Sequence, residues 1–155
     1  MCSADEANRA EPWWLRERLL PHLELPADLP VHFIDEKTVT ATDLDAAQSR
    51  FRLPTRGVLR NLRPILTAEE LDLLEEHGGG RRTGLLVLVA DANAGIIELE
   101  MTSGRGTSLT GEGYMEFIAD CSFTAGDVVN IWAFTHYLSP PCLVIARKPK
   151  TPTPA

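Results

Sequence analysis

The sequence lacks the features that mark membrane, secreted and disulfide-stabilised proteins. Its 155 residues contain no apolar run near the roughly 20 residues that a membrane-spanning helix needs. Cys2, Cys121 and Cys142 form a sparse, odd-numbered set, which favours a reducing intracellular compartment over a disulfide framework. The first residues carry acidic side chains where a signal peptide has a basic leader, so we expect no secretory leader. The length is typical of one domain.

Recognisable catalytic and metal-binding motifs are also absent. The four histidines, His22, His32, His77 and His136, stand apart from one another, and no two cysteines have metal-ligand spacing. No nucleophile elbow, dinucleotide-binding or phosphate-loop motif occurs in the required context. We therefore expect a protein that is not an enzyme and that uses no cofactor or metal. A catalytic set scattered along the sequence stays open as an alternative.

Lysine is scarce, because twelve of the fifteen basic residues are arginines, in a chain of net charge −7. Residues 46–63 contain no acidic side chain and five arginines: Arg50, Arg52, Arg56, Arg60 and Arg63. A guanidinium matches phosphate oxygens and the edge of guanine better than an ammonium does. The alternative is pairing with the acidic residues at 69–76, which contributes little free energy.

Residues 1–36 are predicted to form an N-terminal extension. Pro12 is suited to open a short helix that carries Trp13 and Trp14, and a proline-rich linker follows it. The tandem tryptophans either dock on the main domain or bind a partner. Docking is the favoured interpretation, because two exposed indoles would form a costly apolar patch.

The rest of the chain alternates between short strands and helices. Strands are predicted at residues 38–42, 51–53, 85–89, 97–101, 128–134 and 142–146. Three helices are predicted. The first spans residues 55–62, the second follows a capping box formed by Thr67 and Glu70, and the third starts at Tyr114. Residues 78–80, all glycine, are predicted to end the second of these helices, and residues 102–108 to form a loop. Such spacing predicts a mainly β barrel or sandwich.

Two separated stretches carry a more specific pattern. The first stretch, residues 42–54, begins with Thr42-Asp43-Leu44 and continues through Arg50 to Pro54. The second, residues 113–134, combines a Gly-Tyr helix start, Gly126-Asp127 and a strand that contains Trp132. In this order and spacing they resemble the B3 DNA-binding domain of plant transcription factors, most closely its divergent branch in flowering plants. The resemblance covers residues 37–147 and implies a seven-stranded open pseudobarrel with two or three short helices. Residues 148–155 are expected to be a disordered tail.

The resemblance also implies two arms that grip the major groove of DNA. The first arm maps to residues 46–50 with its exit at 53–56, and the second maps to residues 102–108. Arg50 is the first choice for a base contact, while Arg52, Arg56 and Arg105 are expected to hold phosphates. The candidate DNA-binding residues are Gln48, Ser49, Arg50, Arg52, Thr55, Arg56, Thr102, Ser103, Arg105, Thr107 and Ser108.

The function implied by the resemblance is sequence-selective binding of double-stranded DNA in transcription regulation, in the nucleus, with other transcription proteins as further partners and no membrane association. Three departures from the family pattern stand out. Tyr114 replaces the usual tryptophan, Thr55 and Arg56 stand where lysines are common, and the second arm is short. The alternative is a protein- or peptide-binding module that has lost DNA binding and uses Trp13 and Trp14.

Overall fold

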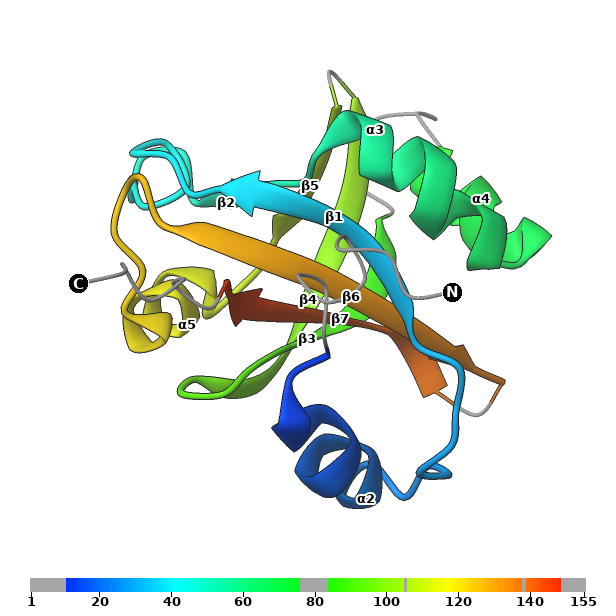
Figure 1. The fold of residues 1–155 in the computed structure, drawn as a ribbon. Helices are drawn as coiled ribbons and strands as arrows, with labels where there is room; N and C mark the ends of the chain where they lie inside the picture. Colours follow the sequence, from blue (N-terminus) through cyan, green and yellow to red (C-terminus); the bar gives the residue numbers. More distant parts are fainter. Residues whose placement is uncertain (1–10, 76–83, 105, 138, 149–155) are drawn as a thin grey trace.

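The chain forms one curled, mixed seven-stranded sheet with short helices at its ends and on its outer face (Figure 1). The structure, a computed structural model, describes residues 11–75, 84–104, 106–137 and 139–148. The strand order is β1-β6-β7-β3-β4-β5-β2, and β3 and β7 are the parallel pair among antiparallel neighbours. The strands are β1 (His32–Thr38), β2 (Arg50–Arg52), β3 (Leu85–Asp91), β4 (Gly95–Gly104), β5 (Gly106–Thr110), β6 (Val128–His136) and β7 (Ser139–Arg147).

This architecture confirms the predicted seven-stranded open pseudobarrel, because β1 and β2 remain as the two edges of the sheet. The alternation of Ile97, Leu99 and Met101 with glutamates does form a strand, β4. Leu99 and Met101 are buried in the core, whereas Glu98 is exposed. A period of two therefore placed the apolar side chains on one face of the sheet.

Two predicted elements are wrong. Residues 38–42 do not form a strand, since β1 ends at Thr38 and residues 41–44 form a turn. The cause is a local side-chain interaction: the Asp43 carboxylate accepts the Thr40 amide at 2.8 Å, and the Asp43 amide donates to the Thr40 hydroxyl at 3.3 Å. Such short polar side chains offer the backbone an alternative to the sheet, which outweighs the β-propensity of threonine.

The second error concerns residues 102–108, which form a hairpin rather than a loop. β4 runs to Gly104 and β5 starts at Gly106, with Thr102 opposite Ser108 and Ser103 opposite Thr107. β5 also pairs with β2 on its other side. Small polar residues suggest a loop in isolation, but here both strand neighbours satisfy the backbone groups of β5.

The main core lies on the inner face of the sheet and is closed by helices. α5 (Tyr114–Cys121) buries Tyr114, Phe117 and Ile118, as predicted. The predicted helix at residues 55–62 is present as three-residue α3 (Thr55–Gly57) followed by the π-helical turn η2 (Val58–Leu62). A 3-10 turn, η3 (Arg63–Ile65), and α4 (Ala68–Glu75) come next.

The predicted capping box at α4 is confirmed by two reciprocal hydrogen bonds. The Thr67 amide donates to Glu70 Oε1 at 2.9 Å, and the Glu70 amide donates to Thr67 Oγ1 at 3.1 Å. Leu59 does not share the buried face of Val58 and Leu62, because it is 59% exposed. The π-helical turn rotates successive side chains by less than an α-helix would, and so moves Leu59 off that face. The predicted helix stop at residues 78–80 lies outside the described residues.

A second core covers the outer face of β6, β7 and β3. Residues 13–22 are helical, comprising the π-helical turn η1 (Leu15–Leu19) and α2 (Leu20–His22), which Figure 1 places on the side of the sheet away from α3 and α4. Leu15 and Leu20 are fully buried here, packed with Trp132, Phe134 and Val144. None of the helices in the described part of the chain is long and apolar enough to cross a bilayer.

The predicted domain limits stay predictions. β1 nevertheless begins at His32, five residues ahead of the expected start at 37, and Lys148 is still tied to the sheet, since its amide donates to Val128 O at 2.9 Å. The remainder of the predicted tail, residues 149–155, lies outside the described part of the chain.

If the N-terminal helix is an integral part of the fold, truncating its buried face will destabilise the whole molecule. We expect Leu15→Ala to lower the free energy of unfolding by about 2–5 kcal/mol, as for other large-to-small changes in a core. Urea denaturation followed by circular dichroism measures this change. Leu59→Ala, at an exposed helical position, is the control and should change stability little. Equal effects of the two variants would contradict the packing described above.

Candidate functional site

A buried carboxylate organises the loop that connects β1 to β2. Asp43 is 1% exposed, and its carboxylate accepts the Arg52 amide at 3.2 Å as well as the Thr40 amide. Lys37 of β1 supplies the counter-charge, with its Nζ 3.1 Å from Asp43 Oδ2. The Lys37 ammonium also lies over the Phe51 ring, 4.8 Å from its centroid. One side chain thus ties the loop to both flanking strands.

Tyr114 holds the same loop from the other side. Its hydroxyl donates a 2.7 Å hydrogen bond to the backbone carbonyl of Asp43, across 71 residues of sequence. Burial, together with the nearby Asp43 charge, raises the pKa of Tyr114 well above its ordinary value. The phenol therefore remains a protonated donor at physiological pH. From the sequence, Tyr114 is expected only to fill the place of the tryptophan that is usual in the family pattern. No signal in the sequence indicates its hydrogen bond to the loop.

The two segments expected to be arms are joined by a strand ladder. In β2 and β5, Arg52 lies opposite Ser108, and the Leu53 amide donates to Thr107 O at 2.8 Å just beyond the ladder. Ser108 in turn lies opposite Thr102 of β4. The exit of the first segment and the hairpin of the second are consequently parts of one continuous surface.

The candidate residues differ in how far their side chains are accessible. Thr107 and Ser108 are buried, at 6% and 7% exposure, so they are packed into the sheet and are not presented to solvent. Arg105 lies outside the described residues. The exposed members of the set are Gln48, Arg52, Thr55 and Arg56, and the half-buried members are Ser49, Arg50, Thr102 and Ser103.

Arg50 and Arg52 point to the same side of β2, opposite the buried ring of Phe51. The chain enters this strand through Ser49, whose φ of +46° is uncommon for a residue with a side chain. The Nε of Arg50 is buried and has no hydrogen-bond partner within the described residues. Arg50 is therefore a cation with an unused donor at the base of the loop.

Gly106 makes room for the second arginine. A Cβ on this residue would lie 3.5 Å from Arg52 Nη1, and its φ of +117° belongs to the region that favours glycine. The guanidinium of Arg52 therefore lies against the turn of the β4–β5 hairpin. This contact brings a charge of the first segment to the tip of the second.

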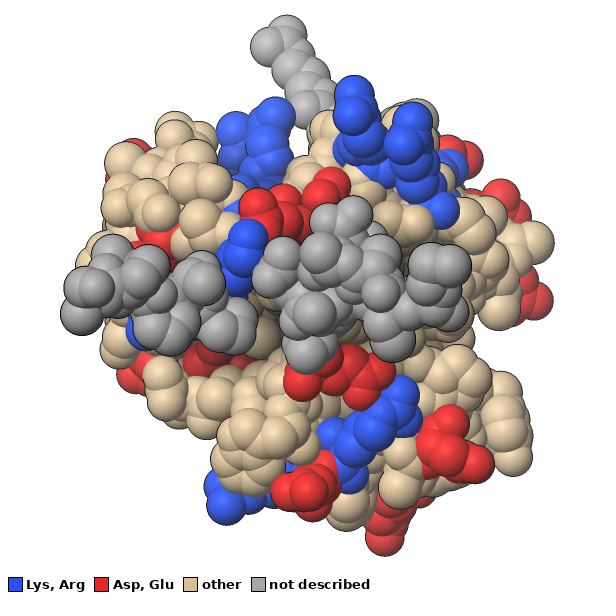
Figure 2. Space-filling view, in the orientation of Figure 1, with Lys and Arg blue, Asp and Glu red and all other residues tan. Residues whose placement is uncertain are grey.

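Positive side chains gather at one edge of the molecule. Figure 2 shows Lys and Arg side chains at the upper edge, above the end of the β4–β5 hairpin and α3 as they lie in Figure 1. Arg56 and Arg60 are exposed on α3 and η2, the elements that follow β2. Arg63, by contrast, forms an ion pair with Glu75 of α4. For this arginine, the alternative of pairing with the acidic residues at 69–76 is the one that holds. The loop 39–49 itself carries no lysine or arginine. The arginines of this region belong to β2, α3 and η2, which follow the loop in sequence.

The two described cysteines are buried core thiols, as predicted. Burial raises the pKa of Cys142 to about 12 and also raises the pKa of Cys121, where the Asp91 carboxylate adds to the effect. Neither thiol is thus available as a thiolate nucleophile at neutral pH. Within the described residues, no cluster of His, Cys, Asp and Glu side chains is suited to hold a metal ion.

The hydrogen bond from Tyr114 can be tested by removing one atom. Tyr114→Phe leaves the buried Asp43 carbonyl without its donor, so we expect a loss of about 1–3 kcal/mol in the free energy of unfolding. Tyr137→Phe is the matched control, since Tyr137 is 89% exposed, and should be neutral. Chemical denaturation of both variants measures the difference. Two unchanged midpoints would mean that the hydroxyl does not hold the loop.

The chain is similar to known proteins in sequence and in structure. A putative B3 domain-containing protein of Arabidopsis thaliana, At3g49610, is 27% identical over 143 residues, which are 83% of this chain and 42% of the relative. The chain therefore spans less than half the length of that curated relative. The crystal structure of the Arabidopsis thaliana transcription factor LEC2–DNA complex matches 77% of this chain and 96% of that chain, at 18% identity and a TM-score of 0.47.

The family comparison covers nearly the whole chain. The model of the B3 domain-containing protein At2g31720-like family matches residues 7–151, a range that includes the sheet, the buried Asp43–Lys37 pair and the N-terminal helix on the outer face. The chain belongs to the At2g31720-like family of B3 domain-containing proteins.

Proposed function

We propose that this chain binds double-stranded DNA, with sequence selectivity, as a regulator of transcription in the nucleus. Membership of a B3 domain family supports this function. The observation that carries the proposal is the ladder between β2 and β5, which joins the two candidate arms into one surface with Arg50 and Arg52 on it. A surface of this kind presents fixed guanidinium groups to a duplex without any rearrangement of the sheet.

The arginines have different proposed roles. Arg50 is the candidate for a bidentate contact to guanine, because it lies at the end of the loop and its half-buried side chain carries a guanidinium fork that matches the guanine edge. Gln48 and Ser49, directly before it, are placed to read neighbouring base edges. Arg52 and Arg56 lie further along the chain and are proposed to hold phosphates, together with Arg105 and the polar side chains of Thr55, Thr102 and Ser103.

Burial changes the proposed role of two candidates. Thr107 and Ser108 pack within the sheet, so they are proposed to position the arm, with their backbone groups committed to β2 and β4. The buried ion pair between Lys37 and Asp43 has a related role, because it fixes the loop against β2 before DNA arrives. Pre-ordering the loop lowers the entropic cost of association.

The overall charge of −7 makes affinity depend on this local group of arginines. Each phosphate contact releases condensed counterions, so binding should weaken steeply as salt rises. The proposal requires no catalytic step and no cofactor. Other transcription proteins are proposed as further partners of the full regulator.

Arg50→Ala is the first test. In a fluorescence anisotropy titration against duplexes selected from a random pool by the unaltered chain, we expect a loss of about 1–3 kcal/mol and a relaxed preference at one base pair. Arg18→Ala removes an exposed arginine of the N-terminal helix and serves as the control. If Arg50→Ala kept both the affinity and the selected sequence, the assignment of the first arm would be wrong.

Arg56→Ala tests the phosphate contacts. We expect affinity to fall by a similar factor on all duplexes, and the slope of log K against log salt to become shallower by about 0.9. Titrations at several salt concentrations measure this slope. If the unaltered chain bound no duplex even at low salt, the proposal would fail, and a peptide-binding module using Trp13 and Trp14 would be favoured instead.

A further inference from the structure

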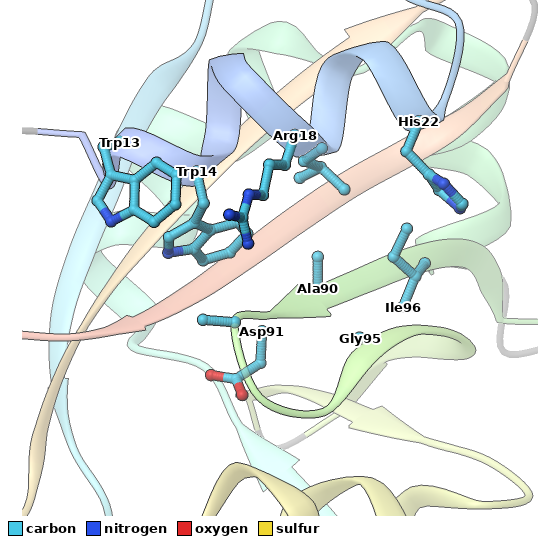
Figure 3. A pocket seen from close by; sticks show the side chains of 10 residues that line it. Trp13, Trp14, Arg18, His22, Ala90, Asp91, Gly95 and Ile96 are labelled. Atoms are coloured by element: carbon cyan, nitrogen blue, oxygen red, sulfur yellow. The ribbon is translucent and has the colours of Figure 1, made fainter.

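Two adjoining cavities lie beside the tandem tryptophans, on the outer face of the sheet. The first has a volume of about 450 Å³ between the N-terminal helix and the turn after β3. Figure 3 shows Trp14, Arg18 and His22 on the helix side of this cavity, with Ala90 and Ile96 on the facing strands. The second has a volume of about 440 Å³ and shares Trp13, Trp14 and Asp91 with the first. Both volumes fall within the range of small-molecule sites in proteins.

The second cavity has aromatic walls. Trp13, Trp14 and Trp132, which are all the tryptophans of the chain, line it together with Phe123. These rings come from three parts of the sequence: the N-terminal helix, the segment after α5, and β6. Large flat apolar surfaces of this kind favour a planar aromatic ligand, which can stack on them.

Two nearly buried residues of this lining carry polar groups. Asn130 and Trp132 lie two residues apart on β6, on the side opposite Ile131, and are 4% and 5% exposed. The indole Nε1 of Trp132 is buried without a hydrogen-bond partner among the described residues, and Asn130 carries a side-chain amide. Unsatisfied buried groups are rare in folded proteins, because each has lost its bonds to water.

The charged groups of the lining are already engaged. Asp91 accepts the amides of Asn93 and Ala94 at the β3–β4 turn. Arg147 Nη2 donates to the carbonyl of Ser122 at 2.7 Å. The Glu11 carboxylate binds the Arg16 guanidinium through both oxygens. Among the nearly buried residues of the lining, the polar side chains left for a ligand are therefore those of Asn130 and Trp132, on β6.

We propose that this cavity binds a small uncharged aromatic compound that carries a carboxamide-type edge. The side-chain amide of Asn130 offers one acceptor and one donor side by side, so its complement is an edge with an adjacent donor and acceptor. An ionised ligand would bury a charge whose potential counter-ions are committed elsewhere. The Asn130 amide makes the specific contact, and the tryptophan rings hold the aromatic body.

Benzamide is the probe, because it combines a single ring with a primary amide. In ¹⁵N-labelled full-length chain, we expect benzamide to shift the side-chain amide resonances of Asn130 and the indole N–H resonance of Trp132. Toluene, which has the ring without the amide, is the matched ligand and should bind about tenfold more weakly, the factor expected for about one net hydrogen bond. The unaltered protein alone thus gives a decisive comparison.

Asn130→Leu removes the polar edge at nearly constant volume. We expect benzamide to bind this variant about tenfold more weakly, with toluene unchanged and the unfolding midpoint not lowered. Asn61→Leu is the control: the Asn61 amide donates to the Ile34 carbonyl at 2.8 Å, so its loss should lower the midpoint and leave benzamide binding intact.

Three results would overturn the proposal. The first is the absence of any benzamide-dependent shift at Asn130 and Trp132 up to millimolar concentration, which would mean that water alone occupies the cavity. The second is equal affinity for benzamide and toluene, which would make the site merely apolar. The third is unchanged benzamide affinity in Asn130→Leu. None of these outcomes bears on DNA binding, because no nucleic acid is present in the experiment.

Discussion

The buried carboxylate of Asp43 is the constraint on which the candidate DNA-binding surface depends. It accepts hydrogen bonds from the Thr40 and Arg52 amides and pairs with Lys37, so it fastens the loop to β1 and β2 at once. Removing one partner of a buried pair leaves the other charge uncompensated, which is strongly destabilising. Tyr114 adds a bond from α5. A flexible eleven-residue connection thereby becomes a fixed projection beside the arginines of β2.

The sheet has two apolar faces, and this property separates the two proposed sites. The inner face holds the main core, while Trp132, Phe134 and Val144 on the outer face are covered by the N-terminal helix. A short helix cannot cover the whole outer face, and the cavities beside Trp13 and Trp14 lie where coverage ends. The arginine-rich edge and the aromatic cavity are thus consequences of the same layered arrangement.

Elements governed by local interactions could be predicted from sequence. The α4 capping box, the alternation in β4 and the buried face of α5 involve residues at most four positions apart. The errors at residues 38–42 and 102–108 have different origins. The first threonine-rich run is bent by the Asp43 side chain, and the second gains strand structure from β2, which lies more than fifty residues away in sequence. A side chain three positions away outweighed β-propensity in the first case, and pairing with a distant strand outweighed loop propensity in the second.

The sequence by itself determined the family and the concentration of arginine between residues 46 and 63, because spacing and composition are properties of the linear chain. Only the tertiary structure decided which of these arginines share a surface, that Thr107 and Ser108 are packed inside the sheet, and that Asn130 lines one cavity with Trp132, whose buried Nε1 has no partner among the described residues. Burial and hydrogen-bond satisfaction depend on contacts between distant segments, and those contacts exist only once the sheet has closed around its core.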